Sequence, residues 1–135
     1  GVTLDGIGID MALVKQPLYA VGATEDHITP WRGTFKTLSL VSSPARYVLS
    51  SSGHILGIIN PLDGNSRHHF WVGDATGASD SKAWRARQER QHGSWWQDWT
   101  AWLHDKCGPL QTPPSDNDPS YTKLGNAPGT YSFEQ

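Results

Sequence analysis

The residues "PLYAVGATEDHITPW", positions 17–31, predict a strand that is followed by a helix. Residues 18–21 form a short apolar run between a proline and a glycine, which predicts a buried strand. Thr29 is then expected to be a helix N-cap and Pro30 the first helical residue, because the fixed φ of proline suits a first turn in which its missing N–H is not needed. We expect this helix to run from about Pro30 to Val41.

A second strand follows the expected helix. The segment "ARYVLSSSGH", residues 45–54, has its apolar centre at Tyr47, Val48 and Leu49. Strand, helix and strand in this order form a βαβ unit, which normally gives parallel strands joined by a right-handed crossover. The sequence therefore predicts an α/β fold.

Two residues with acid–base chemistry follow these two strands. Asp26 comes just after the first strand and His54 just after the second, separated by 54 − 26 = 28 residues. Neighbouring parallel strands bring their carboxyl ends side by side, which is where open α/β sheets place their sites. We therefore expect a carboxylate oxygen of Asp26 to lie within hydrogen-bond reach of a ring nitrogen of His54.

An acid followed along the chain by a histidine fits the α/β-hydrolase order of nucleophile, acid and histidine. In this reading Asp26 orients the imidazole of His54, which takes a proton from a hydroxyl or thiol. Asp26 also has a plain structural reading as a helix cap or macrodipole partner. Glu25 is expected to face solvent, and His27 is an alternative functional histidine. Glycines on either side of His54 indicate close backbone approach or a special turn.

Tryptophans gather in the segment "GSWWQDWTAWLHDKCG", residues 93–108. Ser94 and Gln97 predict a capping box at the start of a helix, and Gly108 predicts its end. The tryptophans at positions 95, 99 and 102 fall on one helical face. We expect this face to pack inside the protein; the alternatives are a surface for hydrophobic polyester and an aromatic platform for sugars.

The remaining segments predict structure more than chemistry. Residues 79–93 are expected to be helical, with Arg85 and Glu89 as a solvated pair. The arginines there form a solvated face, with contact to coenzyme A phosphates as the alternative reading. Residues 109–135 are expected to form an extended tail. We thus divide the chain into a βαβ core (1–60), a loop with tryptophan-rich helices (61–108) and this tail, all within one domain.

Composition excludes several classes of function. The chain has 135 residues, a formal charge of -2 and one cysteine. The charge gives no reason to expect nucleic acid as a partner, and no apolar run is long enough for a membrane span. A single cysteine suits a reducing cytoplasm. His68 and His69 lack metal-ligand spacing, so we expect neither a metal site nor a cofactor.

Four motifs occur in the order and at the spacing found in one enzyme family. They are "EDHITPW" (25–31), "SGHILGIINP" (52–61), "GSWWQDWTAWL" (93–103) and "APGTY" (127–131). With them the chain resembles the C-terminal portion of the class I polyhydroxyalkanoate synthases, which have an α/β-hydrolase fold. The resemblance implies that Asp26 and His54 serve a cysteine nucleophile, which takes (R)-3-hydroxyacyl groups from coenzyme A and builds polyester.

The chain departs from this family pattern at the nucleophile. Such enzymes carry it upstream of the acid on a Gly-x-Cys/Ser-x-Gly elbow, yet residues 1–25 contain neither cysteine nor serine. Cys107 lies downstream, at the end of the tryptophan-rich helix, and is not expected to replace the nucleophile. We therefore expect the chain to be inactive alone and to pair with the upstream part of a synthase.

Three further expectations follow. Missing upstream strands leave a sheet edge open, so we expect a homo-oligomer. The location implied is cytoplasmic, at polyester granules. The alternative function is a non-catalytic module that contacts granules or a partner chain through the tryptophan helix.

Overall fold

The computed structural model describes residues 2–62, 67–113, 120 and 124–134. Its strands are β1 (Val2–Leu4), β2 (Ile7–Ile9), β3 (Leu18–Ala23), β4 (Ala45–Ser50), β5 (His69–Asp74) and β6 (Gln91–His92). Its α-helices are α1 (Trp31–Lys36), α2 (Ser81–Ala86) and α3 (Trp96–Cys107). Short 3-10 turns are η1 (Met11–Leu13), η2 (Thr37–Ser39) and η3 (Tyr131–Phe133).

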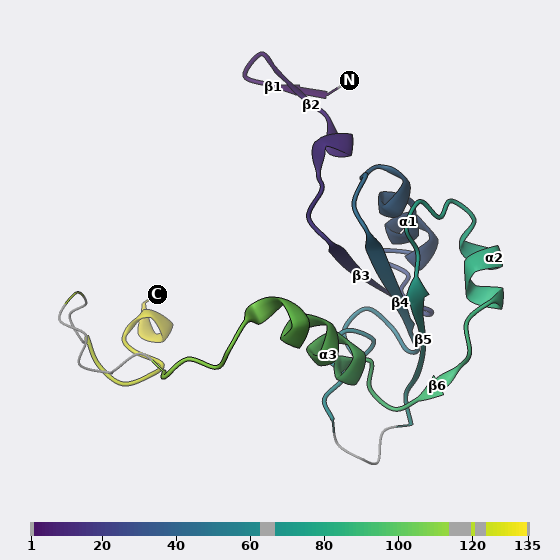
Figure 1. The fold of residues 1–135 in the computed structure, drawn as a ribbon. Helices are drawn as coiled ribbons and strands as arrows, with labels where there is room; N and C mark the ends of the chain where they lie inside the picture. The colour runs from purple at the N-terminus through teal and green to yellow at the C-terminus, as the bar shows by residue number, and fades with distance from the viewer. Residues whose placement is uncertain (1, 63–66, 114–119, 121–123, 135) are drawn as a thin grey trace.

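The main sheet has four strands in the order β3-β4-β5-β6 (Figure 1). β3 and β4 are parallel, as the βαβ pattern predicted, and α1 with η2 forms the crossover between them. β5 runs antiparallel to β4, and β6 runs antiparallel to β5. The predicted α/β class is therefore confirmed, and the sheet is mixed because β5 and β6 join the parallel pair in antiparallel orientation.

Helices cover both faces of the sheet. On one face, α1 and α2 enclose a core that includes Phe35, Tyr47 and Trp84, each no more than 1% exposed. On the other face, Val48 and Phe70 pack against Trp95 and α3. Successive residues of β4 point to opposite faces, so this strand is buried from both sides.

The first helix differs from its prediction at both ends. Thr29 does not cap it, because its hydroxyl and its N–H both donate to the Asp26 carboxylate. Pro30 occupies the N-cap position and provides no side-chain cap. The α-helix ends at Lys36, and its continuation is a 3-10 turn in which the Ser39 hydroxyl donates to the Lys36 carbonyl at 2.8 Å. Such local hydrogen bonds compete with the regular helical ladder.

β5 is a strand that the sequence analysis did not predict. Its residues, "HFWVGD", follow His68 and pair with β4 in a register that sets Trp71 opposite Leu49. The expected segment of loop and helices between residues 61 and 108 therefore also contributes two strands to the sheet. The antiparallel return is a tertiary contact, which the local pattern of two histidines and a short apolar run does not reveal.

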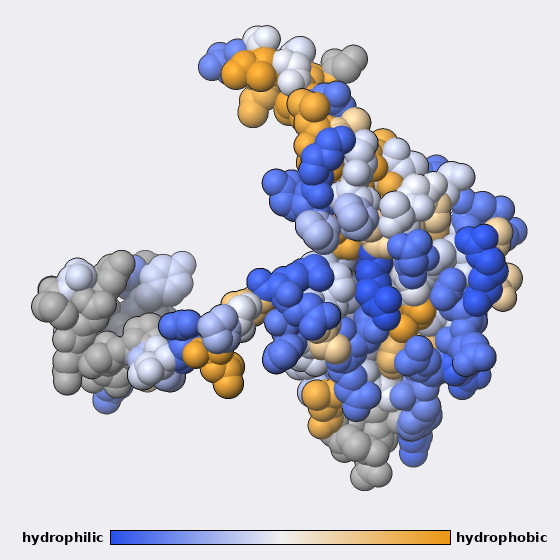
Figure 2. Space-filling model, in the orientation of Figure 1, coloured by the Kyte–Doolittle hydropathy of each residue, from blue (hydrophilic) through white to orange (hydrophobic). Residues whose placement is uncertain are grey.

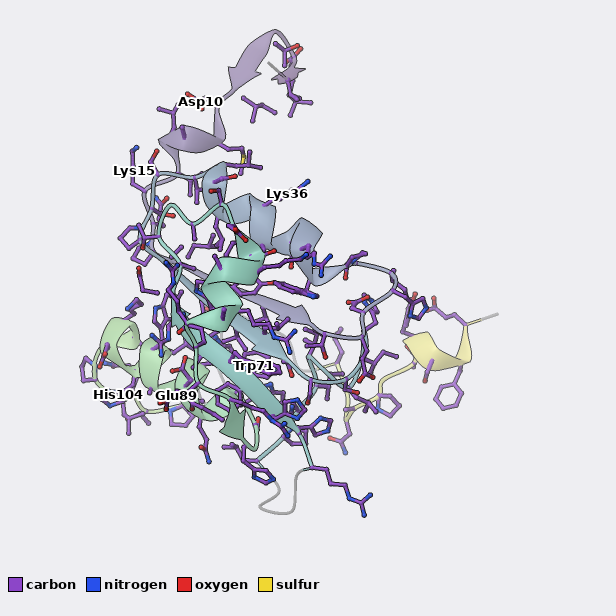
Figure 3. All side chains as sticks on the ribbon, turned by 90° about the vertical axis from the view of Figure 1, so that its right-hand side faces the viewer. Asp10, Lys15, Lys36, Trp71, Glu89 and His104 are labelled. Atoms are coloured by element: carbon purple, nitrogen blue, oxygen red, sulfur yellow. The ribbon has the colours of Figure 1, made fainter. Side chains whose placement is uncertain are left out.

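α2 is shorter than the helical segment that was predicted. It begins after Asp80, whose carboxylate accepts hydrogen bonds from the N–H groups of Lys82 and Ala83. It ends before Glu89, so the expected i, i+4 pair does not form on this helix. The guanidinium of Arg85 lies 4.2 Å from the ring centre of Trp71 instead, and Figure 3 shows Trp71 on the sheet close to this helix.

α3 confirms the packing interpretation of the tryptophans and corrects the predicted cap. Trp95 occupies the N-cap position without a side-chain cap, and the hydroxyl of Ser94 accepts the N–H of Trp96. The capping box with Gln97 is therefore wrong. Gly108 has a φ of 72° and ends the helix as predicted. The rings of Trp95 and Trp102 pack against Tyr19 of β3.

Both ends of the described chain extend away from the sheet (Figure 1). The β1–β2 hairpin exposes apolar side chains such as Val2, Leu4 and Ile7 (Figure 2). Residues 109–113, 120 and 124–134 hold little regular structure beyond η3. Within the described residues, the helices are too short or too polar to span a bilayer.

Candidate active site

The structure brings Asp26 and His54 together at the carboxyl ends of β3 and β4. Nδ1 of His54 lies 2.9 Å from Oδ2 of Asp26. This contact confirms the predicted geometry, while the catalytic roles of the two residues remain predictions. The side chain of Asp26 is 5% exposed and that of His54 is 45% exposed, so the imidazole stands between a buried carboxylate and solvent.

Backbone hydrogen bonds tie together the two loops that carry these residues. The N–H of Thr24 donates to the carbonyl of Ser50 at 2.8 Å, and the N–H of Glu25 donates to the carbonyl of Ser52 at 3.0 Å. Ser52 has a φ of 74°, which is rare for a residue with a side chain. The parallel pairing of β3 and β4 is thereby extended into the loops, which fixes the acid relative to the histidine.

Four donors surround the carboxylate of Asp26. Oδ1 accepts the N–H groups of Ile28 and Thr29 at 2.9 and 2.8 Å, while Oδ2 accepts the Thr29 hydroxyl at 2.7 Å and contacts His54. The N–H of Thr29 contributes most to holding the pKa of Asp26 well below its usual range. Burial opposes this effect, and the Thr29 hydroxyl, His54 and the Ile28 N–H add to it. The carboxylate is therefore ionised at neutral pH.

An ionised carboxylate defines the tautomer of its partner. Such a group only accepts hydrogen bonds, so Nδ1 of His54 must be the donor in this contact. In the neutral imidazole, Nε2 then carries the lone pair that can accept a proton. The pair can thus act as a general base, with Asp26 stabilising the imidazolium that forms.

His54 sits on a compact turn that requires glycine at one position. The N–H of Gly57 donates to the carbonyl of Gly53 at 2.9 Å. A Cβ at Gly57 would lie 2.5 Å from the Cβ of Ala23 and 2.7 Å from the Gly53 carbonyl oxygen. A Cβ at Gly53 would meet only the Glu25 carbonyl oxygen, at 3.7 Å. The close approach expected from the glycines is therefore confirmed at Gly57.

The tryptophan segment contacts the residues that follow His54, which the sequence analysis missed. The indole N–H groups of Trp95 and Trp96 donate to the carbonyls of Gly57 and Ile58 at 2.9 and 3.0 Å. The hydroxyl of Ser94 also donates to the carbonyl of Asn60. Adjacent tryptophans with polar N–H groups are the signal that such contacts were available, but the acceptors are backbone carbonyls that no sequence pattern marks.

Other candidate residues lie apart from this pair. Glu25 and His27 are exposed, and the Asp26 carboxylate contacts His54 and not His27. Cys107 is exposed at the last position of α3. This helix of 12 residues is about 18 Å long, and its other end is hydrogen-bonded to the turn that carries His54. Cys107 is thus placed away from the acid–histidine pair.

The two neighbouring histidines have structural contacts at the start of β5. The N–H of His69 donates to the Ser51 hydroxyl at 3.0 Å, and the ring of His69 packs edge-on against Trp71. Nδ1 of His68 lies 3.4 Å from the same hydroxyl. In the part of the chain that the structure describes, no group of three or more His, Cys, Asp or Glu side chains is placed to hold a metal ion.

Known proteins resemble nearly the whole chain. It is 40% identical over 131 residues to the poly(3-hydroxyalkanoate) polymerase subunit PhaC of Cupriavidus necator, covering 96% of this chain and 22% of that protein. It is 38% identical over 132 residues to poly(3-hydroxyalkanoate) polymerase 2 of Ectopseudomonas oleovorans, covering 97% and 23%. It is 30% identical over 132 residues to a PhaC subunit of Rhizobium etli, covering 98% and 20%.

These similarities confirm the resemblance that the four motifs indicated. The chain is homologous to one region of the polyhydroxyalkanoate polymerases and spans about a fifth of the length of these curated relatives. No model of a known protein family matches the chain.

Proposed function

We propose that this chain supplies the acid–histidine pair of a polyhydroxyalkanoate synthase with an α/β-hydrolase fold. The reaction transfers (R)-3-hydroxyacyl groups from coenzyme A thioesters to a growing polyester. The observation that carries this proposal is the 2.9 Å contact between Nδ1 of His54 and Oδ2 of Asp26 at the ends of adjacent parallel strands. Homology to the polymerases supports the proposed class of substrate.

The geometry supports a base that serves a nucleophile from outside residues 1–135. Nε2 of His54 takes the proton of a cysteine thiol, and the thiolate attacks the thioester carbonyl. The carbon–sulfur bond to coenzyme A breaks, and the imidazolium returns its proton to the departing thiolate. His54 next deprotonates the hydroxyl of the acceptor chain, which attacks the carbonyl of the acyl-enzyme. The bond between the acyl group and the cysteine sulfur breaks, and the released thiolate takes the proton back from the imidazolium. Asp26 stabilises the imidazolium in both steps.

The outer edge of β3 is where we propose that the rest of the catalytic domain joins. β3 is the first strand of the sheet order, and no strand pairs with its outer side within the residues that the structure describes. An open strand edge readily pairs with an added strand. The upstream part of the synthase is the proposed occupant, and a second copy forming a homo-oligomer is the alternative. The proposed location is the cytoplasm, at polyester granules.

The non-catalytic alternative needs exposed tryptophans. Trp95 is 5% exposed, and Trp96, Trp99 and Trp102 are half-buried against the sheet or against one another. An aromatic face that already packs internally offers little surface to a granule or a sugar. The packing therefore favours the catalytic proposal.

The test is complementation with a separate nucleophile. The chain is mixed with an upstream synthase fragment that carries the Gly-x-Cys-x-Gly elbow, and (R)-3-hydroxybutyryl-coenzyme A is added. Free coenzyme A should appear only when both pieces are present. His54→Ala should abolish this release, and Asp26→Asn should lower it by up to about 10⁴-fold, as in the serine proteases, because the imidazole loses its correct tautomer.

Two controls make the result decisive. Cys107→Ala should leave coenzyme A release unchanged, because Cys107 lies at the far end of α3. His27→Ala should also leave it unchanged, because the Asp26 carboxylate contacts His54 instead. Release by the chain alone that is lost in Cys107→Ala, or release that survives His54→Ala, would overturn the proposal.

A further inference from the structure

A basic groove lies between α1 and α2 on the face of the sheet opposite α3. Its volume is about 390 Å³, within the usual range for a ligand site. The residues that line it are Trp31, Arg32, Trp71, Lys82, Arg85 and Ala86. Among these described lining residues there are three cations and no carboxylate, in a chain whose formal charge is -2. The positive charge of the groove is therefore local.

Two of the three cations, Arg32 and Arg85, lie over aromatic rings. The guanidinium of Arg85 lies 4.2 Å from the ring centre of Trp71, and that of Arg32 lies 5.7 Å from the ring centre of Trp31. The ion pairs among the described residues involve none of the groove cations. Asp80 is the N-cap of α2, where its carboxylate accepts two backbone N–H groups and also interacts with the charge of Lys82. The guanidinium of Arg85 thus stacks closely on a ring while its N–H groups keep their donor capacity.

The positive field extends to the start of β5. Burial is the main cause that lowers the pKa of His69, and the charges of Arg90 and Arg85 add to it. The N–H of Ser51, directly after β4, donates to the carbonyl of His69 at the start of β5. An anion in the groove would therefore be attracted by charges on α1, α2 and the loop that follows α2.

The groove lies at the same end of the sheet as Asp26 and His54. Trp31 is the first residue of α1, directly after the loop that carries Asp26. Its Cβ is 2.9 Å from the position that a Cβ on Gly22 would take, near the carboxyl end of β3. Trp71 pairs with Leu49, next to the last residue of β4. A ligand in the groove would thus extend along this edge of the sheet toward the acid–histidine pair.

We propose that the basic groove binds a phosphorylated nucleotide. Arg32, Lys82 and Arg85 supply charge-assisted hydrogen bonds to the phosphates, for which arginine has the matching planar geometry. The half-buried indole of Trp31 supplies an aromatic surface for the base. Under the function proposed above, the nucleotide is the adenosine phosphate end of the coenzyme A thioester. Only this choice of source rests on that function; affinity for the nucleotide itself does not.

The test is equilibrium binding of adenosine 3′,5′-bisphosphate to the chain by calorimetry at low salt. We expect saturable binding that weakens as salt is raised. Arg85→Gln and Arg32→Gln should each weaken it about tenfold, because each removes a charge-assisted contact. Arg85→Lys should recover part of the affinity. The matched controls are Arg87→Gln and Lys36→Gln, which remove the same charge outside the groove and should change the dissociation constant less than twofold.

Several outcomes overturn the proposal. Absence of saturable binding does so, and so does equal weakening by Arg85→Gln and Arg87→Gln, which would indicate diffuse attraction. Inorganic phosphate that competes as well as the nucleotide would remove the role of Trp31. Adenosine triphosphate that binds as tightly as the bisphosphate would keep the groove as a nucleotide site but exclude coenzyme A as its specific source.

The result is independent of the catalytic proposal. His54→Ala should leave nucleotide affinity unchanged while it abolishes coenzyme A release in the complementation assay. Nucleotide binding without any His54-dependent release would overturn the proposed function alone. Release without nucleotide binding in the groove would overturn this inference alone.

Discussion

The indole N–H of Trp95 donates a hydrogen bond of 2.9 Å to the backbone carbonyl of Gly57, on the turn that carries His54. Trp95 is 5% exposed and packs on the face of the sheet opposite α1 and α2. A single residue therefore anchors α3 to the sheet and satisfies a buried carbonyl beside the proposed catalytic histidine. The tryptophan-rich segment has a structural function in placing His54.

Trp95→Phe should separate this hydrogen bond from ring packing. Phenylalanine keeps an aromatic ring but lacks the donor, so the buried Gly57 carbonyl loses its partner. We expect the free energy of unfolding to fall by about 1–3 kcal/mol in urea denaturation. The amide resonances of residues 54–58 should also shift. Trp102→Phe is the control, because that ring contacts Tyr19 and Lys106. Equal effects on the 54–58 amides in both variants would contradict the prediction.

Gly57→Ala should destabilise the His54 turn. The added methyl would lie 2.5 Å from the Cβ of Ala23 and 2.7 Å from the Gly53 carbonyl oxygen, so the backbone must shift. We expect a loss of about 1–3 kcal/mol in the free energy of unfolding. Gly53→Ala places its methyl in ordinary contact, 3.7 Å from the Glu25 carbonyl oxygen. It should therefore cost clearly less in the same urea titration.

Asp98 anchors the first turn of α3 to two strands. Its carboxylate accepts the Tyr19 hydroxyl and Nε of Arg46, each at 2.8 Å, and forms an ion pair with the same arginine. Asp98→Ala leaves a half-buried arginine and a tyrosine hydroxyl without this partner, so unfolding should become easier by about 1–3 kcal/mol. Asp105→Ala, on the same helix with a side chain 79% exposed, should change stability by less than about 0.5 kcal/mol. Similar losses in thermal denaturation would contradict the anchoring role.

The pKa of Asp26 should depend on Thr29 in two separable ways. The Thr29 N–H is the largest cause of the lowered pKa, and the hydroxyl is a smaller one. Thr29→Val removes only the hydroxyl and should raise the pKa part of the way to its ordinary value of about 3.9. The carboxyl ¹³C shift, followed by acid titration, measures this change. A pKa that is unaltered in Thr29→Val would contradict the assigned hydroxyl contribution.

The lowered pKa also gives a direction for stability. Because the folded-state pKa of Asp26 lies below its unfolded-state value, the ionised carboxylate contributes fully to the free energy of unfolding above about pH 4. This contribution is lost as pH falls through the folded-state pKa. Thr29→Val should raise the folded-state pKa and so reduce this contribution. The difference in free energy of unfolding between wild type and Thr29→Val, measured by urea denaturation, should therefore shrink at strongly acidic pH.

Local sequence patterns were sufficient to predict the βαβ core and the ends of its strands. Apolar runs bounded by turn residues are local signals, and they placed Asp26 and His54 after β3 and β4. Parallel pairing then brings the two loops together, because adjacent strands share an edge of the sheet. Four short motifs also indicated the family that the comparisons report.

The sequence did not determine how the carboxylate of Asp26 is satisfied. Thr29 has the composition of a helix cap, yet its donors go to Asp26, and the helix starts later than expected. Local preferences allow both arrangements. The close pairing of the two loops selects one of them, because a buried carboxylate needs its hydrogen bonds more than an exposed helix start needs a cap.

The strand β5, the contacts of the tryptophans and the basic groove depend on long-range packing and could not be predicted from local patterns. β5 returns antiparallel beside β4, and its identity as a strand depends on that pairing. Trp95 donates to the carbonyl of Gly57, 38 residues away in the sequence. Arg85 lies over the ring of Trp71, because α2 ends before Glu89, the partner that was predicted for this arginine. These contacts join segments through backbone carbonyls and ring faces. Such partners carry no periodic signal in the sequence, so their positions follow from the packing of the whole chain.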